Sequence, residues 1–166
     1  MRVGELLESR FELLSHYATG GMGVVYRARD RETGSQVAVK VLRGRGRIDV
    51  QRFELEARLM QKLVHPRIVR YIAAGITHDG ARYLVEEWVD GISLRDHMTR
   101  TGLTPSEAVM AVRNLAEALA EAHRHGVVHR DVKPDNVILQ GGELSHPRLL
   151  DFGIAREMFD GRPDRD

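Results

Sequence analysis

The chain has 166 residues, of which 42% are hydrophobic and 30% charged, values typical of a folded globular protein rather than a disordered one. Its 25 Lys and Arg against 24 Asp and Glu leave a formal net charge of +1. This balance argues against a nucleic-acid binder or a polybasic membrane binder, because a concentrated positive field holds such partners. No apolar run reaches the ~18 residues of a membrane span, and the lack of cysteine excludes disulfides and thiolate metal sites. The composition predicts a cytoplasmic globular protein.

The first half of the chain is predicted to be rich in β-strands. Its candidate strands are short, contain many β-branched or aromatic residues, and are separated by turns that contain glycine. They are Phe11–Tyr17, Val24–Ala28, Val37–Leu42, Ile68–Ile76 and Arg82–Val89. A single helix is expected among them, at about Val50–Leu63, with Asp49 as its N-cap.

The second half begins with a helix that the sequence marks clearly. Thr104-Pro105-Ser106-Glu107 is a capping box with proline at the first helical position, and Gly126 suits the helix end. The apolar residues predicted to face inward are Ala108, Val112, Leu115 and Leu119. Other apolar residues lie off this face, so the helix is expected to need partners on more than one side; they are Val109, Ala116 and Ala120. Short strands are expected at Val137–Leu139 and Arg148–Leu150.

Two charged residues of opposite sign are predicted on apolar faces of the first half. Glu56 falls on the stripe of the first helix, where a carboxylate is costly unless a cation meets it. Lys40 shares a strand face with Ala38, because side chains alternate along a strand. The alternatives are that Glu56 reaches water at the edge of its stripe and that Lys40 is a solvated strand end. Together, the two placements favour a Lys40–Glu56 ion pair.

A glycine-rich segment between the first two predicted strands is a candidate phosphate-binding loop. Glycines let backbone N–H groups approach phosphate oxygens closely, although such a hairpin can also be an ordinary turn. The segment is neither a Walker loop nor a dinucleotide fingerprint, because a strand follows it rather than a helix. Its residues before the second strand are Ala18, Thr19, Gly20, Gly21, Met22 and Gly23.

The richest cluster of chemistry follows the long helix, in His129-Arg130-Asp131-Val132-Lys133-Pro134-Asp135-Asn136. Asp131 can accept a hydroxyl proton, Lys133 can stabilise a transferring phosphoryl group, and Asn136 can bind Mg²⁺ through its oxygen. Farther on, Asp151 ends an apolar strand in Leu149-Leu150-Asp151-Phe152-Gly153, where it is suited to hold a metal that bridges phosphates. A charged surface loop is the alternative, but it leaves the apolar residues around the cluster unexplained.

In this order and spacing, the motifs from about Phe11 to Arg156 resemble the eukaryotic-type protein kinase family and, within it, the bacterial serine/threonine kinases. The resemblance implies an α+β bilobal protein-kinase-like fold. Residues 1–89 would form a complete β-rich N-lobe with one helix, and residues 90–166 the start of a helical C-lobe. The family's activation segment and later helices have no counterpart before Asp166. We therefore expect an incomplete C-lobe, and little or no kinase activity of the isolated chain.

The resemblance also implies roles for individual residues. Lys40, paired with Glu56, would contact the α- and β-phosphates of ATP under the loop Ala18–Val25. Asp131 would be the catalytic base, with Lys133 beside it, and Asn136 and Asp151 would bind Mg²⁺ or Mn²⁺. His129 and Phe152 would be packing elements. The adenine would lie between Val25, Ala38 and Ile138 and bond to the backbone of Glu87 and Val89.

The chain departs from the family pattern at two positions of the nucleotide site. Ala18 replaces the first glycine of the loop. Glu86 occupies the position that resembles the family's gatekeeper, where a hydrophobic residue is usual. A carboxylate behind the adenine is expected either to compete for Lys40 or to turn toward a polar exit and matter little.

These observations predict a serine/threonine protein kinase of a signalling pathway that transfers the γ-phosphoryl of Mg·ATP to a protein hydroxyl. Neither a nucleic-acid partner nor a membrane segment in this chain is expected, although a downstream segment of a longer protein could supply an anchor. One alternative is a non-catalytic nucleotide-binding or scaffold fragment. Another is a small-molecule phosphotransferase of the aminoglycoside-kinase type, against which Lys133-Pro134 and Asp151-Phe152-Gly153 argue.

Overall fold

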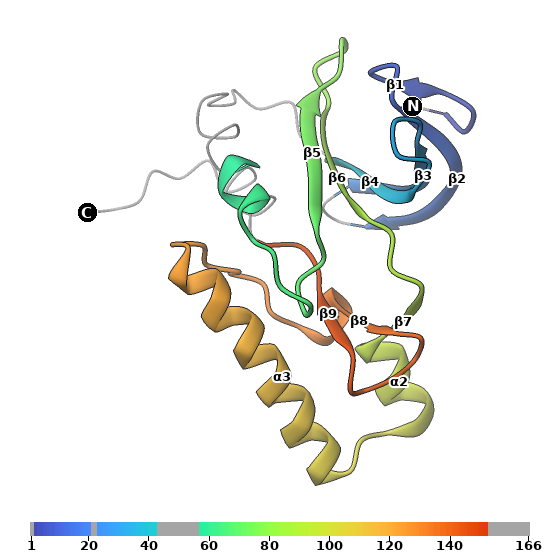
Figure 1. Ribbon diagram of the computed structural model, residues 1–166. Helices are drawn as coiled ribbons and strands as arrows, with labels where there is room; N and C mark the ends of the chain where they lie inside the picture. The colour runs from blue at the N-terminus through green and yellow to red at the C-terminus, as the bar shows by residue number, and fades with distance from the viewer. Residues whose placement is uncertain (1, 21–22, 43–56, 153–166) are drawn as a thin grey trace. The chain divides into compact units, whose positions relative to one another are not determined.

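The computed structural model describes residues 2–20, 23–42 and 57–152 (Figure 1). The chain forms two compact units. In the described part, the first holds the residues up to 57 and Tyr71–Trp88, and the second holds Arg58–Arg70 and residues 89–152. Residues 57–61 are helical, whereas the first part of the predicted helix, Asp49 and Glu56 included, lies outside the described residues.

The first unit is built on one antiparallel sheet with the strand order β1-β2-β3-β4-β6-β5. The expected strands are present, but the fourth begins three residues later than predicted and the fifth ends two residues earlier. The two-residue β1 was not predicted, because it is too short to show a pattern. The bounds are β1 Leu6–Leu7, β2 Phe11–Gly20, β3 Gly23–Asp30, β4 Gln36–Leu42, β5 Tyr71–Ile76 and β6 Arg82–Glu87.

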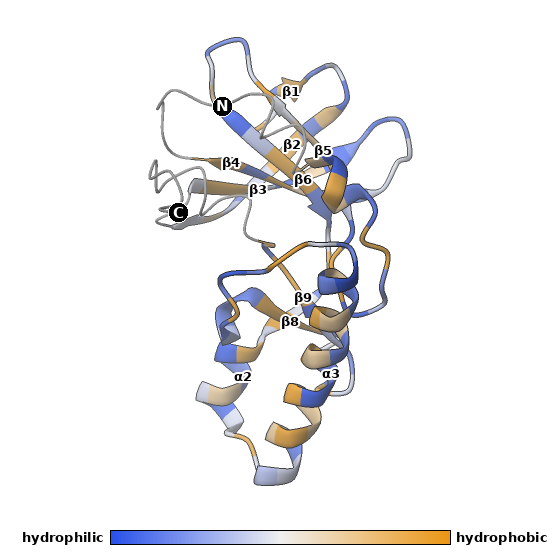
Figure 2. Ribbon diagram, turned by 90° about the vertical axis from the view of Figure 1, so that its left-hand side faces the viewer, coloured by the Kyte–Doolittle hydropathy of each residue, from blue (hydrophilic) through white to orange (hydrophobic). Residues whose placement is uncertain are grey.

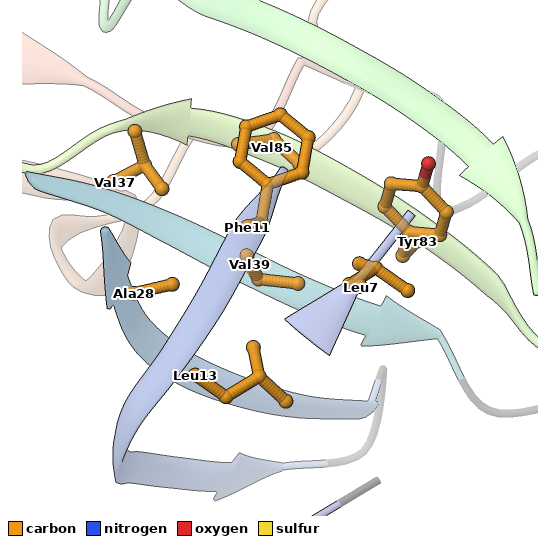
Figure 3. Close-up of a cluster of buried hydrophobic side chains, with 8 residues drawn as sticks. All are labelled: Leu7, Phe11, Leu13, Ala28, Val37, Val39, Tyr83 and Val85. Carbon is orange, nitrogen blue, oxygen red and sulfur yellow. The ribbon is translucent and has the colours of Figure 1, made fainter. Parts of the chain in front are cut away.

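One face of this sheet carries the hydrophobic core of the first unit (Figure 3). The buried side chains come from β1, β2, β3, β4 and β6 and are Leu7, Phe11, Leu13, Ala28, Val37, Val39, Tyr83 and Val85. Because side chains alternate along β4, Ala38 and Lys40 lie on the opposite face from Val37 and Val39. The shared face predicted for Ala38 and Lys40 is therefore confirmed.

Gly75 of β5 allows the aromatic ring of Tyr83 to lie directly against the backbone. A Cβ atom added at Gly75 would lie 2.4 Å from Tyr83 Oη, and the Tyr83 ring is almost fully buried. Because the ring cannot move away, Gly75→Ala should lower the free energy of unfolding by about 1–3 kcal/mol. Urea denaturation followed by circular dichroism measures this loss. Gly20→Ala is the matched control, since nothing lies within 4 Å of its added Cβ; equal losses in the two variants would contradict the packing argument.

A partly buried ion pair fixes the turn between β3 and β4. Arg10 donates from Nε to Asp30 Oδ1 at 3.0 Å and from Nη2 to Asp30 Oδ2 at 2.8 Å, while the backbone N–H of Glu32 donates to Asp30 Oδ1 at 3.0 Å. The guanidinium and this N–H lower the pKa of Asp30 from its ordinary 3.8 to about 2, although burial opposes them. The folded state therefore stabilises the charged carboxylate.

Asp30→Asn should lower the free energy of unfolding by about 1–3 kcal/mol at pH 7, because it removes a charged partner of Arg10. The folded pKa of Asp30 lies below the unfolded one, so its contribution is complete above about pH 4 and falls as the pH drops toward 2. Urea titrations at pH 7 and pH 2.5 should thus show a wild-type advantage that shrinks in acid. Glu32→Gln is the control: Glu32 bonds to the same arginine at 3.0 Å but is 64% exposed, and should cost less than about 0.5 kcal/mol. An advantage independent of pH would contradict this account.

The second unit combines helices with a small sheet of strand order β7-β8-β9. The expected strands in this unit are present, and β7 and α2 are elements that were not predicted. Residues 58–70 join this unit because the N–H of Val69 donates to Leu149 O at 2.9 Å and the N–H of Leu149 donates to Arg67 O at 2.8 Å. The expected division after residue 89 had instead placed residues 58–70 with the N-lobe. The bounds are β7 Gly91–Ser93, α2 Leu94–Thr101, α3 Pro105–Arg124, the 3₁₀ turn η1 Pro134–Asn136, β8 Val137–Gln140 and β9 Pro147–Leu149.

Helix α3 begins at the predicted capping box, in which Thr104 and Glu107 bond to each other's backbone N–H. Its last turn is followed by Gly126, whose φ of +73° is left-handed and ends the helix. The predicted inward face was wrong at Val112, which is 66% exposed. The prediction gave weight to large apolar side chains, whereas the buried face of α3 is built mainly from alanines, whose small size lets the helix pack closely. The buried residues are Ala111, Asn114, Leu115, Ala118 and Ala122.

The hydropathy of the described helices differs from that of a membrane span. Helix α3 alternates hydrophobic and hydrophilic residues along its length (Figure 2). Among the residues that the structure describes, no helix combines the length and the low charge needed to cross a bilayer.

Candidate functional site

The loop between α3 and η1 gathers polar side chains around the carboxylate of Asp131. Lys133 Nζ donates to Asp131 Oδ2 at 2.6 Å, and Asn136 Nδ2 donates to the same oxygen at 3.1 Å. Asn136 Nδ2 also donates to the backbone oxygen of Asp131 at 2.8 Å. The residues predicted to be a base, a phosphoryl-stabilising cation and a metal ligand are thus brought together on one carboxylate.

His129 anchors this loop to the end of β9. Its Nε2 lies 2.7 Å from Leu150 O and must donate, because a carbonyl can only accept, while the N–H of Asp131 donates to Nδ1 at 3.3 Å. These two bonds select the neutral imidazole with its proton on Nε2. Burial lowers the pKa of His129 and so favours the same neutral form. Its ring also contacts Phe152 with centroids 4.7 Å apart, so the two predicted packing residues meet.

Asp151 is held next to the Asp131 loop through the backbone. The N–H of Leu150 donates to Asn136 O at 2.8 Å, so the residue before Asp151 is bonded to the predicted metal ligand. Arg130 and Asp151 have left-handed φ values of 63° and 56°, which are uncommon outside glycine and are frequent at functional sites. Two hydrogen bonds to Leu150 hold the residues beside Arg130 and Asp151 in place. His129 Nε2 donates to Leu150 O, and the N–H of Leu150 donates to Asn136 O.

The donor atoms available here fit Mg²⁺. The NH₂ group of Asn136 donates to Asp131, which leaves the side-chain carbonyl oxygen of Asn136 to bind a metal. Asp151 contributes a carboxylate. Oxygen ligands are those that Mg²⁺ prefers, and Mg²⁺ in nucleotide sites needs only one or two protein ligands beside phosphates and water. Within the described ranges no group of three or more His, Cys, Asp or Glu side chains has the arrangement of a metal site. A two-ligand Mg²⁺ site is consistent with that.

In the first unit, the predicted adenine and phosphate contacts share the sheet face opposite the core. Val25 of β3 pairs with Lys40 of β4, and Ala38 pairs with Glu86 of β6. Side chains directly opposite each other in an antiparallel pair lie on the same face. Val25, Ala38, Lys40 and Glu86 therefore form one continuous patch across three strands.

Lys40 forms an ion pair within this patch, and its partner is Glu86. Lys40 Nζ lies 2.6 Å from Glu86 Oε2, and the two side chains are 12% and 6% exposed. Glu86 therefore turns to Lys40, the first of the two orientations expected for it. The predicted partner Glu56 lies outside the described residues, so the Lys40–Glu56 pair stays a prediction.

The glycine-rich segment forms the β2–β3 hairpin. Ala18 pairs with Val25, Thr19 with Val24, and Gly20 with Gly23, while Gly21 and Met22 lie outside the described residues. A Cβ atom on Gly23 would lie 2.0 Å from Val41 O, and its φ is +152°. Glycine at position 23 is thus required by contact with β4, a structural reason that the phosphate-loop interpretation did not include.

An aromatic contact that the sequence analysis missed holds the strand end beside the predicted hinge. Glu87 ends β6, and the next residue, Trp88, packs edge-on against Tyr17 with ring centroids 4.9 Å apart. The Arg27 guanidinium lies 4.9 Å from the centre of the Trp88 ring, and the Trp88 N–H donates to Gln36 O at 3.3 Å. The aromatic residues beside the glycine loop and beside Glu87 were the feature of the sequence that could have indicated this contact.

The two predicted adenine contacts of the second unit, Val89 and Ile138, are half-buried. Ile138 lies in β8 opposite Ser93.

Comparison with known proteins agrees with this geometry. Residues 11–164 match the model of the protein kinase domain. A serine/threonine-protein kinase of Myxococcus xanthus, pkn2, is 41% identical over 155 residues, which cover 91% of this chain and 19% of that protein. The crystal structure of the PknI kinase domain of Mycobacterium tuberculosis superposes with a TM-score of 0.82 at 31% identity, over 93% of this chain and 62% of that one. The structure of Rad53 1–466 in complex with AMP-PNP gives a TM-score of 0.77 at 29% identity, over 87% of this chain and 38% of that one.

The chain belongs to the protein kinase family, as a domain of the bacterial serine/threonine type with a bilobal kinase fold. The resemblance to that family, and the fold that it implied, are confirmed. The chain spans 19–24% of the length of the first curated relatives that it matches.

Proposed function

We propose that the chain carries the nucleotide-binding and catalytic-loop part of a serine/threonine protein kinase, which transfers the γ-phosphoryl of ATP to a protein hydroxyl. The observation that supports this most strongly is the convergence of Lys133 and Asn136 on Asp131 Oδ2. The relatives named as serine/threonine kinases and the AMP-PNP complex of Rad53 support ATP as the phosphoryl donor. We also propose a signalling role and a cytoplasmic location for these residues.

In this reaction Asp131 orients the acceptor hydroxyl and takes its proton as the oxygen attacks the γ-phosphorus. The new O–P bond forms while the bond from the γ-phosphorus to the β,γ-bridging oxygen breaks, and ADP leaves. Lys133 stabilises negative charge on the transferring group, and Lys40 contacts the remaining phosphates. Asn136 and Asp151 would hold Mg²⁺, which neutralises charge on the phosphate oxygens when bound.

The roles of the nucleotide-contacting residues are part of the same proposal. Val25, Ala38 and Ile138 would contact the adenine, and the backbone of Glu87 and Val89 would bond to its edge. The hairpin from Ala18 to Gly23 covers the phosphates through its N–H groups.

The test is transfer from γ-labelled ATP by the intact protein in which this chain occurs, with a generic protein as acceptor and phosphoamino-acid analysis of the product. Phosphoserine or phosphothreonine that forms only with Mg²⁺ or Mn²⁺ is the expected result. Nucleotide binding without transfer would favour a scaffold module, and transfer to an aminoglycoside but not to protein would favour a small-molecule phosphotransferase.

A further inference from the structure

The Lys40–Glu86 ion pair is fixed by the sheet itself. Glu86 pairs with Ala38 across β4 and β6, and Lys40 pairs with Leu84, so the two charged side chains are diagonal neighbours on one sheet face. Diagonal neighbours on adjacent strands are within reach of long side chains, and here the charged atoms meet at 2.6 Å. Because both residues belong to paired strands, the strand register determines the contact.

The surroundings of the pair keep water away from it. Both side chains are largely buried, and Tyr71 of β5, opposite Glu86, is buried as well. Burial and the nearby charge of Glu86 both raise the pKa of the Tyr71 hydroxyl, so the tyrosine stays neutral. Charges in such a place interact more strongly than at the surface, and removing one leaves the other poorly compensated.

The position of this pair bears directly on nucleotide binding. An ammonium group has three N–H donors, and one of those on Lys40 is directed to Glu86. Phosphate oxygens that approach Lys40 must compete with the Glu86 carboxylate for its ammonium group. The carboxylate therefore opposes phosphate binding by engaging the cation.

We infer that Glu86 is a positioning residue that holds Lys40 against the sheet and thereby weakens the binding of nucleotide phosphates. The inference rests on the proposed function, because it takes Lys40 as the phosphate contact. Glu86 would thus set the nucleotide affinity of this chain through Lys40, without itself touching the reacting atoms.

The test compares dissociation constants for Mg·ATP and for adenosine, measured by calorimetry on the intact protein in which this chain occurs. Glu86→Gln should bind Mg·ATP roughly tenfold more tightly than the wild type, because the isosteric amide releases the ammonium. Adenosine has no phosphate, so its affinity should not change. Glu86→Met checks that the effect does not depend on the amide, and thermal unfolding checks that each variant folds. Glu12→Gln is the control, since Glu12 is a carboxylate of the same sheet that pairs with Arg31.

A double-mutant cycle separates an effect through Lys40 from a direct one. In a Lys40→Met background, Glu86→Gln should lose most of its gain in Mg·ATP affinity. Unchanged Mg·ATP affinity in both Glu86 variants would overturn the inference. So would an equal gain for adenosine, or a full gain in the Lys40→Met background.

A second measurement examines the pair without any nucleotide. The carboxylate of Glu86 favours the charged form of Lys40, so Glu86→Gln should increase the fraction of neutral, nucleophilic amine. Acetylation of Lys40 by acetic anhydride, followed by mass spectrometry, should be several-fold faster in Glu86→Gln than in wild type or Glu12→Gln. Equal rates would overturn the inference. If no variant bound nucleotide while acetylation still depended on Glu86, the proposed function would be refuted, and with it the effect on affinity. If nucleotide bound normally and its affinity did not change with the residue at position 86, this inference alone would be refuted.

Discussion

Asp131→Asn should lower the rate of phosphoryl transfer by the intact protein roughly 10²- to 10⁴-fold, because it removes the group that accepts the hydroxyl proton. The amide keeps the size of the carboxylate, but it replaces the acceptor to which Lys133 donates at 2.6 Å with a weaker one. Mg·ATP should still bind with nearly wild-type affinity, since Asp131 serves the acceptor hydroxyl rather than the nucleotide. Steady-state kinetics and equilibrium binding on the same preparation measure both quantities.

Asp135→Asn is a matched control in the same loop. Asp135 accepts from Arg95 Nε at 2.9 Å with both of its oxygens, on an exposed part of the unit, and has no place in the proposed chemistry. The same substitution should therefore leave transfer close to the wild-type rate. Equal losses in the two variants would show that the loop as a whole, rather than the Asp131 carboxylate, determines the rate.

Asp151→Asn should act on a different step, the metal-dependent binding of ATP. A neutral amide is a poorer ligand for Mg²⁺ than a carboxylate, so the affinity for Mg·ATP should fall by roughly tenfold or more. Transfer should fall as well, because the bound nucleotide would be less well positioned. The ATP dissociation constant measured at increasing Mg²⁺ concentration distinguishes this variant from Asp131→Asn.

The comparison of these two variants tests the division of roles. If Asp131→Asn and Asp151→Asn lost Mg·ATP affinity equally, the assignment of one residue to the acceptor and the other to the metal would be wrong. Without Mg²⁺, wild type and Asp151→Asn should bind ATP with similar, weak affinity, because the difference between them depends on the metal.

Much of the fold follows from local patterns in the sequence. The strands of the first unit are marked by β-branched residues and glycine turns, and α3 by its capping box, so their existence was predictable. The short strands β1 and β7 are too brief for any periodicity, and α2 depends on a single N-cap, Ser93. The inward face of α3 could not be read from residue size, because close packing selected alanines over Val112.

The candidate site was predictable where its residues are close in sequence. Asp131, Lys133 and Asn136 lie within six residues, and their chemistry is apparent from that spacing. Glu86, which pairs with Lys40 in the described part of the chain, is 46 residues away from it, and the sequence offered both Glu56 and Glu86 as candidate partners. Strand register places Glu86 beside Lys40, and register depends on long-range pairing that local patterns do not specify. The contact between Tyr17 and Trp88 was missed for the same reason.

A single-turnover assay shows whether the Asp131 carboxylate drives phosphoryl transfer to a protein hydroxyl. The intact protein, in excess over γ-labelled Mg·ATP, is mixed with a protein acceptor, and labelled phosphoamino acids are followed over time in wild type and Asp131→Asn. Label should appear on serine or threonine of the acceptor in wild type, at a rate at least about 10²-fold above that of Asp131→Asn. Equal rates in the two proteins, or the absence of any labelled serine or threonine while Mg·ATP is bound, would contradict it.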